Sequence, residues 1–146
     1  MELNEVNFPA EPIPDSDMLY LRVHKNNLDS KVSDEKLKIK LIAFDPKPEG
    51  SSELSTDWSK YSSALETQNR SKTPSENGVL SFIVNEIRNV PLALEVRHDP
   101  MTLKEHFREN RAHSLVLNLP PRKNDLGFRT KLRGISKWEI PIESNL

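Results

Sequence analysis

The chain has 146 residues, with 21 lysines and arginines against 22 aspartates and glutamates, and a hydrophobic fraction of 35%. This length is typical of one domain, and the charge balance indicates no general affinity for nucleic acid. The absence of cysteine excludes disulfides, thiolate metal ligands and a cysteine nucleophile. No segment approaches the ~20 apolar residues that cross a bilayer, so we expect a cytoplasmic protein without membrane attachment.

The first 17 residues form an acidic, proline-rich segment. They contain no lysine or arginine. Their acidic residues are Glu2, Glu5, Glu11, Asp15 and Asp17. Such a segment buries too little apolar surface to offset the entropy lost on ordering. We therefore predict a disordered or loosely attached arm over residues 1–17 and a single domain over residues 18–146. The basic segment 120–138 has the opposite charge, and two interpretations stay open: the arm lies across this segment, or both segments are solvated surface.

Two early segments alternate between apolar and polar residues, as half-buried strands do. In residues 18–24, Leu19, Leu21 and Val23 would share one face. Residues 36–44 alternate more strictly, with lysines at 36, 38 and 40. We predict a strand over each segment, with the three lysines on the exposed face of the second.

The next segment has the features of a helix. Trp58 and Tyr61 are three residues apart and would share a helix face. Ser63 and Glu66 have the spacing of a capping box, in which the two residues satisfy the first main-chain N–H groups of a helix. We predict one broken helix or two short ones over residues 55–70.

The sequence pattern in the second half of the chain predicts further strands and helices. Phe128, Leu132 and Ile135 recur at the spacing of an amphipathic helix. A short helix after Thr102 is also predicted, and further strands are expected over residues 79–84, 92–96, 114–119 and 138–142. Taken together, these elements favour an α+β domain, with a mixed or largely antiparallel sheet of five to six short strands and a few short helices.

Three of the four histidines and three arginines lie close together between positions 97 and 113. They are Arg97, His98, His106, Arg108, Arg111 and His113. Histidine is the side chain that ordinarily changes charge near neutral pH, and arginine binds carboxylates and phosphates. This segment is therefore the best candidate in the sequence for acid–base chemistry or anion binding. The opposing interpretation is that its charges pair with neighbouring carboxylates on a solvated surface.

A second cationic feature lies near the end of the chain. Arg129, Arg133 and Lys137 recur every four residues along the predicted last helix and would form a basic stripe. Such a stripe would suit a nucleic acid or an acidic protein partner equally well.

Our leading hypothesis is a binding or regulatory module that recognises a protein or polyanionic partner. The predicted binding residues are His24, Arg97, Arg108, Arg129, Arg133 and Lys137. The alternative is a metal-independent phosphodiesterase or nuclease-like enzyme, in which His98 and His113 exchange protons and Arg111 stabilises the phosphorane charge. The chain has none of the common nucleotide- or metal-binding motifs, so we expect no cofactor and no metal site. The sequence does not predict an oligomeric state.

Overall fold

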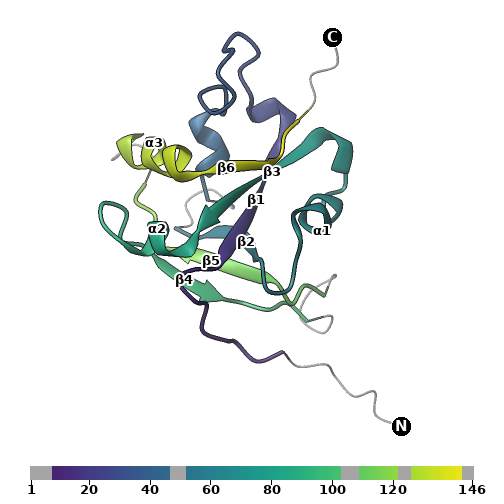
Figure 1. The fold of residues 1–146 in the computed structure, drawn as a ribbon, viewed down its shortest axis with the longest axis vertical. Coiled ribbons are helices and arrows are strands. Elements are labelled where there is room, and N and C mark those ends of the chain that lie inside the picture. Colours follow the sequence, from purple (N-terminus) through teal and green to yellow (C-terminus); the bar gives the residue numbers. More distant parts are fainter. Residues whose placement is uncertain (1–7, 47–51, 103–108, 122–125, 143–146) are drawn as a thin grey trace.

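The computed structural model describes residues 8–46, 52–102, 109–121 and 126–142. These residues form a six-stranded antiparallel sheet in the order β4-β5-β2-β1-β3-β6 (Figure 1). The strands are β1 (Met18–His24), β2 (Leu54–Trp58), β3 (Asn77–Ile83), β4 (Glu95–His98), β5 (His113–Leu117) and β6 (Lys137–Ile140). The described α-helices are α1 (Ala64–Asn69), α2 (Val84–Arg88) and α3 (Leu126–Ile135). The predicted α+β class and largely antiparallel sheet are confirmed.

One face of the sheet carries the core. Because side chains alternate along a strand, Leu19 and Val23 of β1 point to this face, and both are fully buried. The neighbouring strands place Trp58 and Phe82 on either side of Leu19. Helices α2 and α3 and the segment before β2 cover this face, contributing Ile39, Phe44, Ile87 and Leu132. Helix α1 lies on the other side of β1 from α2 and α3 (Figure 1).

The opposite face of the sheet is polar. The intervening residues of β1 point to it, among them Arg22 and His24. Asp57 of β2 pairs with Tyr20, and Asn77 of β3 pairs with His24, so these side chains share the same face. Part of this face is covered by α1, and the remainder supplies the side chains of the candidate site.

The helix predicted over residues 55–70 is wrong in its first half, which is strand β2. The strand forms because alternate residues, including Trp58, bury against the core, and this tertiary burial outweighs local propensity. Helix α1 begins only at Ala64. The capping box is confirmed: Ser63 Oγ accepts the Glu66 N–H at 3.1 Å, and Glu66 Oε1 accepts the Ser63 N–H at 3.0 Å.

The strand predicted over residues 36–44 is also wrong. Asp34 Oδ1 accepts two successive main-chain N–H groups, at 2.9 and 2.8 Å, and so bends the chain into a turn. Ile39 makes a single β-bridge with Leu28, and a 3₁₀ turn follows over Leu41–Phe44. Strict alternation was therefore overridden by a local side-chain hydrogen bond.

The described part of the arm, residues 8–17, is attached to the sheet. Ile13 is 4% exposed and belongs to the core. The main-chain N–H of Glu11 donates to His98 Nδ1 at 3.0 Å, and Asp15 pairs with Arg88 at 2.7 Å. The structure thus differs here from the predicted loose arm, because one buried isoleucine and specific polar contacts offset the ordering cost. Residues 1–7 lie outside the described residues.

The carboxylate of Glu11 is surrounded by donors. Its Oε1 accepts from Lys60 Nζ at 2.7 Å, its Oε2 accepts from the Tyr61 hydroxyl, and Arg111 Nη2 lies 3.8 Å from Oε2. The hydrogen bond from Lys60, followed by that from Tyr61, holds the pKa of Glu11 below its ordinary value. The arm is thereby coupled to the turn that follows β2.

Changing Glu11 to Gln is expected to lower the melting temperature at neutral pH and to have no effect in strong acid. A carboxyl group with a depressed pKa in the fold contributes stability above its unfolded-state pKa and loses it as pH falls through the folded-state pKa. Melting curves of the wild type and Glu11→Gln across this pH range should therefore converge in acid. A difference that persisted at low pH would show that the carboxylate charge is not the cause.

Candidate functional site

The sheet opens between its two central strands. Among the described residues, β1 and β2 pair only through Leu19–Trp58 and Tyr20–Asp57. Beyond these pairs, β1 remains paired with β3 and β2 remains paired with β5, but β1 and β2 are no longer paired with each other. The same register would place Arg22 opposite Ser55, but the ladder ends before it reaches them. The two residues therefore face each other across a split in the sheet.

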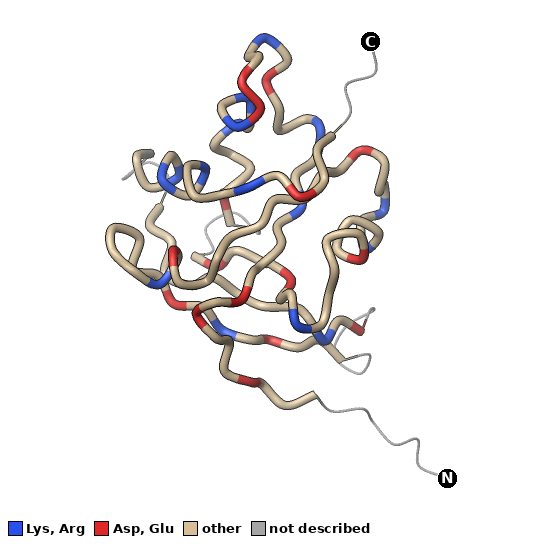
Figure 2. Tube along the Cα trace, viewed as in Figure 1, with Lys and Arg blue, Asp and Glu red and all other residues tan. Residues whose placement is uncertain are grey.

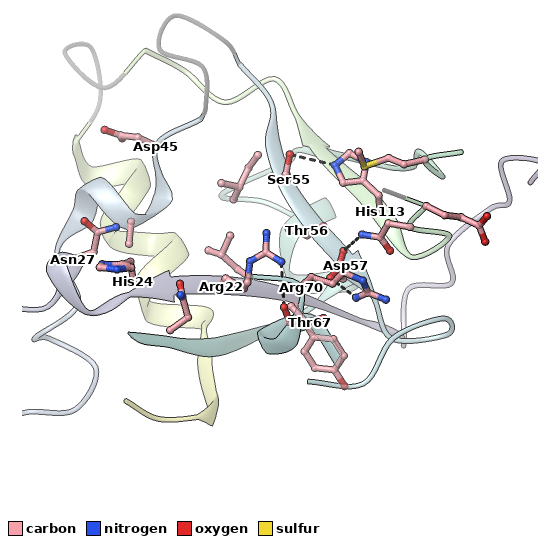
Figure 3. Close-up of a pocket in the computed structure, with 18 residues that line it drawn as sticks. Arg22, His24, Asn27, Asp45, Ser55, Thr56, Asp57, Thr67, Arg70 and His113 are labelled. Atoms are coloured by element: carbon pink, nitrogen blue, oxygen red, sulfur yellow. Dashed lines mark hydrogen bonds and ion pairs between the residues drawn. The ribbon is translucent and has the colours of Figure 1, made fainter. Parts of the chain in front are cut away.

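A pocket of about 460 Å³ occupies this split (Figure 3). Its volume lies within the range of small-molecule sites. Leu21 and Leu54, from the core face, also line it, so the pocket reaches between the strands. Its polar lining side chains are Tyr20, Arg22, His24, Asn27, Asp45, Ser55, Thr56, Asp57, Thr67, Arg70, Asn77, Glu109, Asn110 and His113.

One wall of the pocket is fixed by Asp57, which is 5% exposed. Its Oδ2 accepts from Arg70 Nη1 at 2.8 Å, and its Oδ1 accepts from Asn110 Nδ2 at 2.9 Å. Arg70 also donates to Ser62 Oγ at 2.7 Å. Because both oxygens of Asp57 are engaged, this carboxylate anchors α1 and the loop before β5 to the sheet.

His113 lies at the same end of the pocket, between a serine and an aspartate. Its Nδ1 is 2.9 Å from the main-chain oxygen of Asp99 and 3.1 Å from Asp99 Oδ2. Its Nε2 is 3.3 Å from Ser55 Oγ (Figure 3). Nδ1 faces two acceptors, so it carries the ring proton, and Nε2 is left to accept the Ser55 hydroxyl. Ser55 belongs to β2 and His113 to β5, and Asp99 directly follows β4.

The other end of the pocket holds His24 and Asn27 (Figure 3). His24 Nδ1 accepts the Asn26 N–H at 3.1 Å, so Nε2 carries the ring proton and faces Glu76 Oε2 at 3.3 Å. Arg22 lies between the two ends and donates from Nη1 to the main-chain oxygen of Thr67 at 3.2 Å.

His98 does not join His113 in the pocket. It lies on the core face of β4, is 2% exposed, and contacts the rings of Trp58 and Tyr61. Its Nδ1 accepts the Glu11 N–H, and its Nε2 donates to the Arg111 main-chain oxygen at 2.6 Å. Both ring nitrogens are therefore occupied by main-chain groups. A shared acid–base role for His98 and His113 on one phosphate does not fit this placement.

The remaining members of the histidine and arginine segment are dispersed. Arg97 pairs with Glu95 at 2.9 Å on the exposed face of β4. The guanidinium carbon of Arg111 lies 4.1 Å from the centroid of the Tyr61 ring, away from the pocket lining. His106 and Arg108 lie outside the described residues.

Two of the three residues predicted to form the basic stripe, Arg129 and Arg133 of α3, make hydrogen bonds within the protein. Arg129 is 1% exposed and donates from Nε to Asp45 Oδ1 at 3.0 Å. Arg133 donates to the main-chain oxygen of Ile39 at 3.1 Å, whereas Lys137 is exposed at the start of β6. Figure 2 shows lysines and arginines interspersed with aspartates and glutamates along the described chain. A common outward cationic face is not formed by these three residues.

Sequence reasoning missed Ser55, Asp99 and Arg22 as site residues. Ser55 was predicted to lie in a helix, and a helix at this position gave no reason to expect its side chain near His113. The signal that could have found it is the alternation of residues 54–58, which turns Ser55 and Asp57 to one face of a strand. His24 and His113 were singled out from the sequence, and both line the pocket.

No protein-family model matches the chain, and neither a curated protein nor a solved structure is detectably similar to it. In the part of the chain that the structure describes, every helix is too short or too polar to cross a bilayer. Across the same residues, no group of three histidine, aspartate or glutamate side chains could hold a metal ion. The function is therefore inferred from the geometry of the pocket.

Proposed function

We propose that the protein is a binding module and that its recognition site is the pocket between β1 and β2. The ligand is a small molecule that carries a carboxylate or a phosphate. This proposal keeps the anion recognition expected from the sequence but moves it from an outer surface to the pocket. The observation that supports this proposal most directly is the position of Arg22 in the middle of the split.

Several features support this choice of ligand. The carboxylates of Asp57 and Asp45 each hold an arginine, Arg70 and Arg129 respectively, at hydrogen-bonding distance. At the His24 end, the side-chain amide of Asn27 adds an N–H donor group to the lining, whereas the amide of Asn77 already donates to Ser71 Oγ and to the Thr73 main-chain oxygen. A guanidinium binds carboxylate and phosphate oxygens through paired N–H donors, and such charge-assisted bonds are the strong ones. The pocket thus combines a cation with polar groups that can orient a ligand.

Changing Arg22 to Gln is expected to weaken binding of the anionic member of a matched pair. Suitable pairs are adenosine monophosphate with adenosine and glucose 6-phosphate with glucose, measured by calorimetry at low salt. The wild type should prefer a phosphorylated member, and the variant should lose about tenfold or more of that affinity, because a charge-assisted hydrogen bond contributes about 1.5–3 kcal/mol.

The matched control is Arg97→Gln, which removes an exposed arginine that pairs with Glu95 outside the pocket. It should leave binding unchanged. Equal affinity for the charged and uncharged members of both pairs, or equal losses in the two variants, would refute anion recognition by the pocket.

A further inference from the structure

We propose that Ser55 is a nucleophile that His113 activates, and that it cleaves small carboxylic esters bound in the pocket. Asp99 is the positioning residue that orients the imidazole. The inference rests on the proposed function in one respect: the anionic group of the substrate binds at Arg22, across the split from Ser55. The ester carbonyl then lies at the Ser55 end of the pocket.

The hydrogen bonds of His113 determine which ring nitrogen carries the proton. Two oxygens of Asp99, one main-chain and one carboxylate, lie 2.9 and 3.1 Å from Nδ1. Both are acceptors, so the proton stays on Nδ1 and the lone pair of Nε2 faces Ser55 Oγ at 3.3 Å. A hydroxyl that donates to such a nitrogen can lose its proton to it as a new bond forms at Oγ.

His113 and Ser55 are both open to the pocket. The side chain of His113 is 16% exposed, so the imidazole is held by its surroundings yet open to the pocket. Ser55 is an exposed residue of β2, and its hydroxyl is open to a ligand in the pocket. The two residues are on neighbouring strands whose register is set by the pairs Asp57–His113 and Ser55–Leu115. Serine and base are thus positioned by the sheet rather than by a loop.

The reaction balances without a metal or a redox partner. Ser55 Oγ attacks the ester carbonyl carbon while His113 Nε2 takes the hydroxyl proton. The bond from carbon to the alcohol oxygen then breaks, and that oxygen takes the proton from Nε2. Water next attacks the acyl-serine, gives a proton to Nε2, and releases the acid as Ser55 Oγ recovers the proton. One ester and one water yield one acid and one alcohol.

The test uses two chromogenic esters, p-nitrophenyl acetate and the mono-p-nitrophenyl ester of succinate, which differ in a free carboxylate. The full-length chain should release p-nitrophenol in a burst, and mass spectrometry of its peptides should place the acyl group on Ser55. Ser55→Ala should abolish the burst. His113→Gln should slow acylation by about 100-fold or more, the usual contribution of a positioned base.

Asp99→Asn separates a positioning role from direct chemistry. The main-chain oxygen of residue 99 still faces Nδ1 in this variant, so the rate should fall by a smaller factor than in His113→Gln. Because the chain has no cysteine, Ser55→Cys offers a second nucleophile at the same position, and its acylation should also depend on His113. Ser52→Ala is the control, since it removes an exposed hydroxyl three residues away.

The outcomes distinguish this inference from the proposed function. A burst with both esters but no preference for the succinate ester would support Ser55 and refute the anion site at Arg22. Acylation at other residues, or a burst that survives in a folded Ser55→Ala protein, would overturn the nucleophile. Binding of anionic ligands without any acylation of Ser55 would support the proposed binding module and overturn the ester cleavage.

Discussion

Replacing Arg129 with Met is expected to lower the free energy of unfolding by about 3–5 kcal/mol. The guanidinium is 1% exposed and donates to Asp45 Oδ1 at 3.0 Å and to the Pro120 main-chain oxygen at 2.8 Å. Removing it takes from the Asp45 carboxylate and the Pro120 carbonyl the hydrogen bonds that Arg129 donates to them, and methionine supplies no donor. The lower end of the range is expected because the Asp45 side chain keeps 22% of its surface exposed.

Chemical denaturation at neutral pH measures this effect, and Lys137→Met is the matched control. Lys137 lies on the same sequence stripe but is exposed at the start of β6. Its replacement should change stability by less than about 0.5 kcal/mol. Equal effects of the two substitutions would refute the assignment of Arg129 to the interior and restore the basic stripe as a common surface.

Replacing His98 with Phe is expected to lower the free energy of unfolding by about 2–4 kcal/mol while leaving the pocket intact. Phenylalanine preserves the packing against Trp58, but it leaves the Glu11 N–H and the Arg111 main-chain oxygen without their partners. The arm should then detach more readily from the edge of the sheet. Denaturation curves and proteolysis of the arm measure the two consequences.

His113→Gln is the comparison for this prediction. Its ring is partly exposed in the pocket, so the change should cost less stability than His98→Phe and affect the reaction at Ser55 far more. The opposite result, with an unaffected fold and a lost activity in His98→Phe, would favour the enzyme with paired histidines that the sequence suggested.

The parts of the fold that were predicted correctly depend on local signals. Strand β1 alternates and α3 has an apolar helical stripe, and both form where their patterns place them. The capping box of Ser63 and Glu66 is a contact within four residues and is also present. Residues 36–44 alternate equally well, yet Asp34 turns that segment instead. One short hydrogen-bonded turn was sufficient to override the periodicity.

The site depends on contacts that no local pattern encodes. His113 meets Ser55 through the pairing of β2 with β5, and it meets Asp99 through the pairing of β4 with β5. His98 and His113 occupy opposite faces because their positions in the β4 and β5 ladder differ by one residue, and successive residues of a strand alternate. From the sequence alone, three nearby histidines suggested one site.

The central claim is that function resides in the pocket between β1 and β2 rather than on an outer basic surface. Nitrogen–proton correlation NMR during a titration with adenosine monophosphate and the succinate monoester tests it most directly. The account predicts that the amide signals that shift belong to residues around Arg22, Ser55, Asn77 and His113. These ligand-induced shifts should be absent in Arg22→Gln. Shifts confined to α3 and β6, or the same shifts in Arg22→Gln, would contradict it.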